Sequence, residues 1–396
     1  MILSLYLLLS QSKAPIVLIP GTMGSILKGS VTGRSTHWYC PKNVKTQTMW
    51  ISKDYSIPPL INCLGDWLSM KYNSSLKDAT NQDGVQMDIF DFGGVGGITF
   101  LDDFANLTNF IPYYKKYIDY LENHGYIVGK DLFGAPFDWR RGIMLGNTYF
   151  TQLKQLIESA FRKNSNQKVS LVGHSLGGFL IQHFLTNITT AEWRSKYIES
   201  ANLVAPSFGG SGTIIENIWN GALSIMTYFG ASSTEMEKMS SSFGSMYDQL
   251  PNFNLFGDKI VFIDENAKSY AARDLPQLFK KYGKFRSTPE IWELHKNTPS
   301  SIPKPIDVPT VITYNDKIST PIGYNDMLKQ YIYADGDALI NSEGPNYACK
   351  NWKSNSKLIC QNLNTPNHSA SHIMMILDDE YIDRVLKYSM NNEWTK

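Results

Sequence analysis

A serine flanked by two glycines is the residue whose setting points most directly to chemistry. The segment Gly173-His174-Ser175-Leu176-Gly177 fits the pattern G-x-S-x-G, follows the apolar run Val169–Val172 and precedes a second apolar run from Phe179. Strand, tight turn and helix in this order project a serine hydroxyl above a sheet, where it can attack an acyl carbonyl. The pattern alone is common, and its alternative is an ordinary glycine-rich turn. The flanking strand and helix therefore make Ser175 the predicted nucleophile.

A serine hydroxyl needs a base to remove its proton, and the base needs an acid to orient it. In folds with this turn the chain order is serine, acid, histidine. His372 directly precedes the apolar run of the last helical pattern, where packing would hold it, and is preferred to His368 as the base. His295 lies in a charged helical stretch and is expected on the solvated surface.

The acid and the oxyanion donors are expected from two further turns. Asp337 follows an apolar run that ends in a turn and is preferred as the acid, with Asp335 capping that turn. The first apolar strand ends in Pro20-Gly21-Thr22-Met23-Gly24, for which a plain β-turn is the alternative. Backbone N–H groups of Thr22 and Leu176 are the predicted oxyanion donors, because such donors must face the developing charge.

The elements that must position these residues alternate between strands and helices. Short apolar runs bounded by Gly or Pro predict buried strands at 16–19, 85–90, 126–128, 169–172, 201–204, 260–263 and 308–314. Amphipathic spacing predicts helices at 113–124, 153–161 and 372–388. This alternation predicts an α/β fold with a mostly parallel sheet covered by helices on both faces. Two stretches, 36–80 and 208–250, interrupt it as excursions.

Composition limits the classes of function. The 396 residues carry a formal charge of +1, which argues against nucleic acid as a partner. An apolar fraction of 42% permits a sizeable core and excludes wholesale disorder. No run approaches the roughly 18 apolar residues of a membrane-spanning helix. No motif calls for a metal or organic cofactor, and none indicates an obligate protein partner.

Three signals predict a secretory or endomembrane route. Residues 1–13 resemble a signal peptide, with an unpaired N-terminal strand as the alternative. Four cysteines form two pairs close in sequence without C-x-x-C spacing, which favours local disulfides among Cys40, Cys63, Cys349 and Cys360. Glycosylation tripeptides begin at Asn73, Asn106, Asn187 and Asn367. A secreted or lysosome-like lumenal protein is expected.

Several motifs make the chain similar to the lecithin:cholesterol acyltransferase and lysosomal phospholipase A family, over nearly all of residues 14–390. The most specific match is Gly134-Ala-Pro-Phe-Asp-Trp-Arg-Arg141. The chain also has the other family motifs in the family's order: the opening strand with its turn, the serine motif, Asp335-Gly-Asp337 and His368-x-x-x-His372. Thr22 stands where relatives carry Asp or Cys, so an acidic pH optimum does not transfer.

The resemblance implies one α/β-hydrolase domain over 14–396 with Ser175, Asp337 and His372 as its triad. It also implies a membrane-binding subdomain near 36–80, enclosed by a Cys40–Cys63 disulfide, and a lid near 208–250 within a cap of about 208–300. Family members cleave a fatty acyl ester of a glycerophospholipid through an acyl-serine and pass the acyl group to water or an alcohol such as a sterol. A phospholipid membrane or lipoprotein-like surface and a lipid alcohol are the implied partners.

Large apolar side chains on the first excursion support a lipid substrate. Trp50, Ile51, Trp67 and Leu68 are expected to reach the surface and bind a membrane interface, with a satellite core under the disulfide as the alternative. Two other functions stay open: a neutral-glyceride lipase or other esterase with the same triad, and a non-catalytic lipid carrier. The acyl acceptor and the ester position attacked are not fixed by the sequence.

Overall fold

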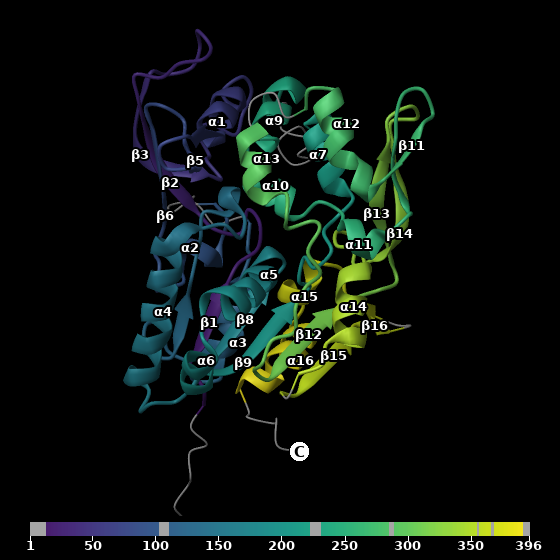
Figure 1. Ribbon diagram of the computed structural model, residues 1–396. Coiled ribbons are helices and arrows are strands. Elements are labelled where there is room, and N and C mark those ends of the chain that lie inside the picture. The colour runs from purple at the N-terminus through teal and green to yellow at the C-terminus, as the bar shows by residue number, and fades with distance from the viewer. Residues whose placement is uncertain are drawn as a thin grey trace, which may run out of the picture.

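A six-stranded sheet forms the centre of the molecule (Figure 1). The computed structural model describes residues 13–102, 111–221, 231–284, 289–354, 356–365 and 368–390, so the predicted signal peptide and the sequons at 106 and 367 lie outside the described residues. All pairings in this sheet are parallel. In spatial order its strands are β15 (Leu358–Asn362), β12 (Thr310–Tyr314), β9 (Ile198–Val204), β8 (Val169–His174), β1 (Ile16–Ile19) and β7 (Leu132–Gly134).

Helices cover both faces of this sheet, as the alternation of apolar runs predicts. Val17 and Ile19 of β1 share one core with residues of α4 (Gly146–Lys163) and α5 (Leu176–His183). Ile16 and Leu18 point the other way and share a second core with α3, α15 and α16. The bounds of those helices are Lys115–Asn123, Met374–Leu377 and Asp379–Met390. Both faces of β1 are therefore buried, which explains its unbroken apolar sequence.

The first excursion is a small antiparallel unit on one side of the central sheet. Its strands are β2 (Leu27–Thr32), β3 (Asn43–Trp50), β6 (Val85–Ile89) and the hairpin β4 (Met70–Asn73) with β5 (Asp78–Asn81), and its helix is α1 (Ile61–Leu68). A disulfide joins Cys40 to Cys63 of α1. The unit lies beside the cap, since α1 contacts α9 and both appear together at the top of Figure 1.

The expectation of exposed membrane anchors on this unit is wrong for three of the four residues. Trp67 and Leu68 are fully buried, Trp50 is 2% exposed, and Ile51 is partly buried. Trp67 packs edge-on against Tyr55, and Trp50 against Trp139. Trp50, Trp67 and Leu68 belong to the same core as Trp139 and Met236 of other segments, so they are part of the protein interior rather than of a membrane surface. Exposed instead are Trp38 at 95% and Ile57 at 55%.

The second excursion and the residues that follow it, as far as His295, form a helical cap above the sheet in Figure 1. Its helices are α7 (Thr213–Asn220), α9 (Ser233–Ser240), α10 (Gly244–Asp248), α11 (Phe253–Phe256), α12 (Leu275–Lys281) and α13 (Pro289–His295). A four-stranded sheet beside it consists of β11 (Ser269–Ala271), β10 (Ile260–Ile263), β13 (Ile318–Asn325) and β14 (Gln330–Gly336). The apolar runs at 85–90 and 260–263 are therefore strands, but they lie outside the central sheet.

The remaining elements connect these units. They are α2 (Gly96–Thr99), α6 (Ala191–Tyr197), α14 (Glu343–Asn351), β16 (Asn364–Thr365), β17 (His368–Ser369) and the short turns of helix Trp139–Arg141, Phe184–Ile188 and Ala272–Asp274. The second disulfide joins Cys349 of α14 to Cys360 of β15. Within the described ranges, no helix combines the length and the apolar character needed to cross a bilayer.

The predicted strand at 126–128 is wrong. The segment 127–131 is a turn, in which the carbonyl of Ile127 accepts from the amides of Lys130, Asp131 and Leu132. The strand of this region is β7, which begins at Leu132. Tyr126 is buried for another reason, because its hydroxyl donates to the carbonyl of Ala14 and its ring fills the second core. Apolar periodicity cannot separate a short core turn from a short strand.

Candidate active site

The turn between β8 and α5 holds Ser175 in an unusual backbone conformation. Its φ is 57° and its ψ is −125°, a region that non-glycine residues rarely adopt. The turn can form because its neighbours have no side chains. A Cβ on Gly177 would lie 2.3 Å from the carbonyl oxygens of Ile19 and Pro20, and one on Gly21 would lie 2.7 Å from Cβ of Ser175. Strand β1 thereby approaches the serine closely.

His372 and Asp337 form a buried pair. Nδ1 of His372 lies 2.8 Å from Oδ2 of Asp337, and their side chains are 8% and 3% exposed. The other carboxylate oxygen accepts from the amides of Leu339 at 3.0 Å and Ile340 at 2.7 Å. The amide of His372 donates to the carbonyl of Asp337 at 2.7 Å, so backbone and side chain are both fixed. With Nδ1 committed to the carboxylate, Nε2 is the nitrogen that can exchange a proton.

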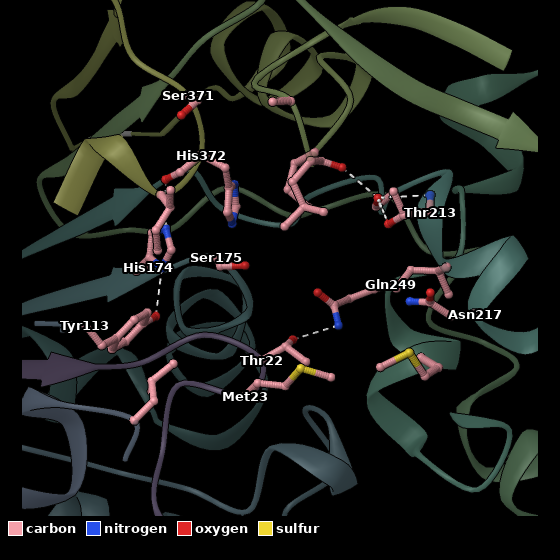
Figure 2. Close-up of a pocket in the computed structure, with 18 of the residues that line it drawn as sticks. Thr22, Met23, Tyr113, His174, Ser175, Thr213, Asn217, Gln249, Ser371 and His372 are labelled. Atoms are coloured by element: carbon pink, nitrogen blue, oxygen red, sulfur yellow. Dashed lines mark hydrogen bonds between the residues drawn. The ribbon is translucent and has the colours of Figure 1, made fainter. Parts of the chain in front are cut away.

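Ser175 and His372 line one cavity of about 460 Å³ between the sheet and the cap (Figure 2). Among the described residues, Ser175 Oγ makes no hydrogen bond with the ring of His372. Hydrogen bonds of this kind are commonly loose in an empty site and tighten when substrate binds. A serine and a histidine that border one cavity, with an aspartate hydrogen-bonded to the far nitrogen of the histidine ring, are the groups that acyl transfer through a covalent serine ester requires.

Hydrogen bonds through Tyr113 and His174, here called the relay, connect His372 to the turn after β1. The amide of Gly21 donates to the hydroxyl of Tyr113 at 2.8 Å, and that hydroxyl lies 2.7 Å from Nδ1 of His174. Nε2 of His174 lies 3.1 Å from the carbonyl of His372. Because a carbonyl can only accept, Nε2 of His174 carries the proton and Tyr113 donates to Nδ1.

Both side chains of the relay are held neutral. Burial, reinforced by the neighbouring ring of His372, lowers the pKa of His174 well below its ordinary value. Burial raises the pKa of Tyr113. Sequence reasoning did not single out Tyr113 and His174, although His174 stands inside the serine motif. One signal could have identified His174: it is a polar residue at the end of a strand that is expected to be buried.

The predicted oxyanion donors lie at the expected turns. Thr22 follows β1 and borders the cavity, and Leu176 is the first residue of α5. In the part of the chain that the structure describes, neither backbone amide donates to another backbone group. A first-turn helix amide has no acceptor in its own helix, so the amide of Leu176 is available to a ligand. The side chain of Thr22 is held from the cap, because Nε2 of Gln249 donates to its hydroxyl oxygen at 2.8 Å.

The cavity wall is mostly apolar. Leu101, Ile214, Met246, Leu339 and Ile340 line it, and the described residues that border it include no Lys, Arg, Asp or Glu. Leu339 and Ile373 line the cavity and are also 39% and 41% exposed, so they mark its opening to the surface. Among the described residues no group of His, Cys, Asp and Glu could hold a metal ion.

Two of the other residues considered from the sequence need correction. His295 is not on the surface: it is 2% exposed and its Nδ1 lies 2.8 Å from Oδ1 of Asp248. Asp335 does not cap the turn before the acid, because its side chain reaches Lys317 on the surface and Asp337 caps the turn itself. The backbone of His368 lies in β17, where it pairs with Thr365 of β16.

Comparisons with known proteins agree with this geometry. The family model described as lecithin:cholesterol acyltransferase matches residues 45–298. "Lysosomal phospholipase A and acyltransferase" of Rattus norvegicus is 26% identical over 391 residues, which cover 95% of this chain and 91% of the relative. "Phosphatidylcholine-sterol acyltransferase" of Gallus gallus is 26% identical over 362 residues, 88% of this chain and 84% of the relative.

A solved structure supports the fold. The chain in "The crystal structure of Tle4-Tli4 complex" superposes with a TM-score of 0.53 at 12% sequence identity, covering 95% of this chain and 97% of that one. Together with the parallel sheet and the serine turn between β8 and α5, this likeness identifies an α/β-hydrolase fold.

Proposed function

The chain belongs to the lecithin:cholesterol acyltransferase family, whose model matches more than half of it, and from that membership we propose how its residues act. It is an enzyme of acyl transfer or hydrolysis on phospholipids. We propose Ser175 as the nucleophile, His372 as the base and Asp337 as the acid that orients it. The observation that carries this assignment is the buried Asp337–His372 pair, which borders the same cavity as Ser175.

In the proposed first half-reaction, Nε2 of His372 takes the proton of Ser175 Oγ as that oxygen attacks the ester carbonyl. The amides of Thr22 and Leu176 stabilise the oxyanion of the tetrahedral intermediate. His372 then returns the proton to the leaving oxygen, and the lysophospholipid departs. In the second half-reaction water or an alcohol gives its proton to His372 and attacks the acyl-serine, and His372 then returns that proton to Ser175 Oγ as the ester bond breaks. Asp337 stays ionised and stabilises the imidazolium in both halves.

The apolar cavity supports a fatty acyl ester as the group that enters. Its described lining residues offer methyl and methylene groups to a chain and include no Lys or Arg that could pair with a phosphate. The phospholipid headgroup is therefore proposed to stay outside, near the opening marked by Leu339 and Ile373. The absence of charge among the lining residues also suits a neutral glyceride, which makes a lipase the second candidate function.

A lipid surface is the proposed partner. Apolar side chains reach solvent both at the cavity opening and on the first excursion, where Trp38 is 95% exposed. Aromatic and aliphatic side chains of this kind enter a membrane interface. Two disulfides suit an oxidising compartment, and a secreted or lysosome-like lumenal location is proposed. The units 36–80 and 208–300 are proposed as the membrane-binding subdomain and the cap.

One assay separates the candidates. The purified protein is incubated with vesicles of phosphatidylcholine, with emulsified triglyceride, or with either lipid plus a labelled long-chain alcohol, and the products are resolved. The proposal expects lysophospholipid with free fatty acid or an alkyl ester from phosphatidylcholine. Release of fatty acid from triglyceride alone would support the neutral lipase instead. No product from either lipid, with no labelling of Ser175 by a long-chain fluorophosphonate, would indicate a lipid carrier.

A further inference from the structure

A cap residue fixes the orientation of the Thr22 hydroxyl. Gln249 follows α10 and is 4% exposed. Its amide nitrogen donates to the carbonyl of Ser245 at 3.0 Å and to the hydroxyl oxygen of Thr22 at 2.8 Å. The Ser245 carbonyl can only accept, which identifies the donating atom as the nitrogen rather than the oxygen of the amide. Both hydrogens of that nitrogen are therefore used.

This arrangement determines what the Thr22 hydroxyl can do. Since Gln249 donates to it, the hydroxyl oxygen acts as an acceptor there, and its own hydrogen is directed elsewhere. In the described ranges that hydrogen has no protein acceptor. Thr22 borders the cavity that contains Ser175, and Figure 2 shows it below the serine, joined to Gln249 by a dashed line. A donor without a partner beside a nucleophilic serine points to an oxygen of the substrate.

We propose that the hydroxyl of Thr22 is a third donor to the oxyanion, in addition to the amides of Thr22 and Leu176, and that Gln249 is the positioning residue that holds it. This inference rests on the proposed function. Donors that are already oriented stabilise a developing negative charge without reorganisation, which is why they contribute to the rate. No bond changes on Thr22: its hydrogen stays on the hydroxyl throughout.

The proposal also assigns a role to the cap. Gln249 is on the cap, whereas Thr22 follows the first strand of the central sheet, 227 residues away in the chain. The oxyanion site is then complete only when the cap is seated on the sheet. Helix α10 supplies both the carbonyl that orients the Gln249 amide and Met246 of the cavity wall.

The decisive experiment compares Thr22→Val with Thr22→Ser on a p-nitrophenyl ester of a short acyl chain. This substrate has an ester carbonyl but no phosphate headgroup. Removing one oxyanion donor typically costs about 10²–10³ in kcat. For a third donor we expect Thr22→Val to lower kcat about 10- to 100-fold with little change in KM, and Thr22→Ser to retain most of it. Thr32→Val, at an exposed threonine of β2, is the matched control and keeps wild-type kcat.

Gln249→Leu tests the positioning residue. Without the amide, the Thr22 hydroxyl can rotate away, so kcat should fall a few-fold in the wild-type background. In the Thr22→Val background the same substitution should change kcat much less, because no hydroxyl is left to orient. Equal losses in both backgrounds would show that Gln249 acts through the cap alone. Thermal unfolding of each variant checks that the folded fraction is unchanged at the assay temperature.

The outcomes separate this inference from the proposed function. Ser175→Ala must be inactive on the same ester, and an active variant would overturn the proposed function itself. If Ser175→Ala is inactive while Thr22→Val has wild-type kcat, the inference alone is wrong. A loss with phosphatidylcholine but none with the p-nitrophenyl ester would also overturn it, because the hydroxyl would then bind the headgroup. If Thr22→Ser loses as much kcat as Thr22→Val, the hydroxyl does not contribute and the side chain has only a packing role.

Discussion

Two buried pairs of aspartate and histidine in this molecule have almost the same local geometry. In each, Nδ1 of the histidine lies 2.8 Å from a carboxylate oxygen of the aspartate. The side chains of Asp337 and His372 are 3% and 8% exposed, and those of Asp248 and His295 are 0% and 2% exposed. In both, the second carboxylate oxygen accepts from backbone amide, at Leu339 and Ile340 in the first pair and at Ile143 in the other.

The difference lies at the far side of each ring. The ring of His372 borders the cavity beside Ser175. The ring of His295 is closed in by backbone, since a Cβ on Gly244 would lie 2.2 Å from its Nε2. The second pair instead joins α10 and α13 of the cap to the segment after Arg141. Distance and burial therefore do not identify a catalytic pair, and an accessible nucleophile does.

The largest effect should follow from removing that nucleophile. Ser175→Ala should lower kcat by about 10⁴-fold or more, because no acyl-enzyme can form. Two measurements check this expectation. Turnover of phosphatidylcholine should disappear, and binding to vesicles of the same lipid should persist. Turnover near that of the wild type would refute the assignment of Ser175 and remove the basis for calling either histidine catalytic.

Matched substitutions of the two aspartates test the comparison directly. Asp337→Asn should lower kcat by about 10³–10⁴-fold with the protein still folded, because the amide favours the wrong tautomer of His372. Asp248→Asn should leave kcat of the folded protein within a few-fold. It should reduce the free energy of unfolding by about 2–4 kcal/mol, because a buried partner is left unmatched.

Urea unfolding and steady-state kinetics, measured on both variants, give the two readouts. Loss of kcat in Asp248→Asn without loss of stability would mean that the cap pair takes part in catalysis. A wild-type kcat in Asp337→Asn would remove the carboxylate from the proposed triad.

The same comparison shows what the sequence could and could not predict. The serine turn, the helical pattern that follows His372 and the strand that leads to Asp337 are local patterns, so Ser175, Asp337 and His372 could be proposed from the sequence. His295 was expected on the surface because its neighbours Glu290, Glu293 and Lys296 are charged. His295 is buried by α10, whose Asp248 is 47 residues away in the chain. The composition of the sequence around His295 does not indicate that contact.

The first excursion fails to follow prediction for a similar reason. Trp50, Trp67 and Leu68 are the side chains that a membrane-binding loop would expose, and the disulfide-tied unit buries them instead. The residues that do reach solvent, such as Trp38, have the same chemistry as those that do not. Only the packing of β3 and α1 decides between them. The relay through Tyr113 and His174 could not be predicted either, because it joins four segments that are far apart in the chain, those of Gly21, Tyr113, His174 and His372.

A smaller effect should come from that relay, which the His295 pair lacks. Tyr113→Phe removes the hydroxyl that accepts from Gly21 and donates to His174, and it leaves the ring in place. We expect kcat to fall about 10-fold through misplacement of the oxyanion turn and the base. Tyr120→Phe, which removes a hydroxyl that donates to Asp383 on the surface, is the control. Equal kcat in the two variants would mean that the relay only fills space.

The smallest effect concerns the stability of the protein as the pH falls. His174, enclosed by Tyr113 and His372, has its pKa held well below the ordinary value of about 6.5, chiefly by burial. Below about pH 6.5 the unfolded chain therefore binds a proton at His174 that the native protein does not bind. His174 thus favours folding above that pH, and this contribution to stability is lost as the pH falls. The slope from one such group is at most about 1.4 kcal/mol per pH unit, or a few degrees in Tm.

His174→Gln keeps a donor and an acceptor but cannot titrate, so its Tm should fall less between pH 7 and pH 5 than that of the wild type. His124→Gln, at an exposed histidine, should keep the wild-type slope. Parallel Tm curves for the wild type and His174→Gln would mean that His174 does take up a proton in the native state.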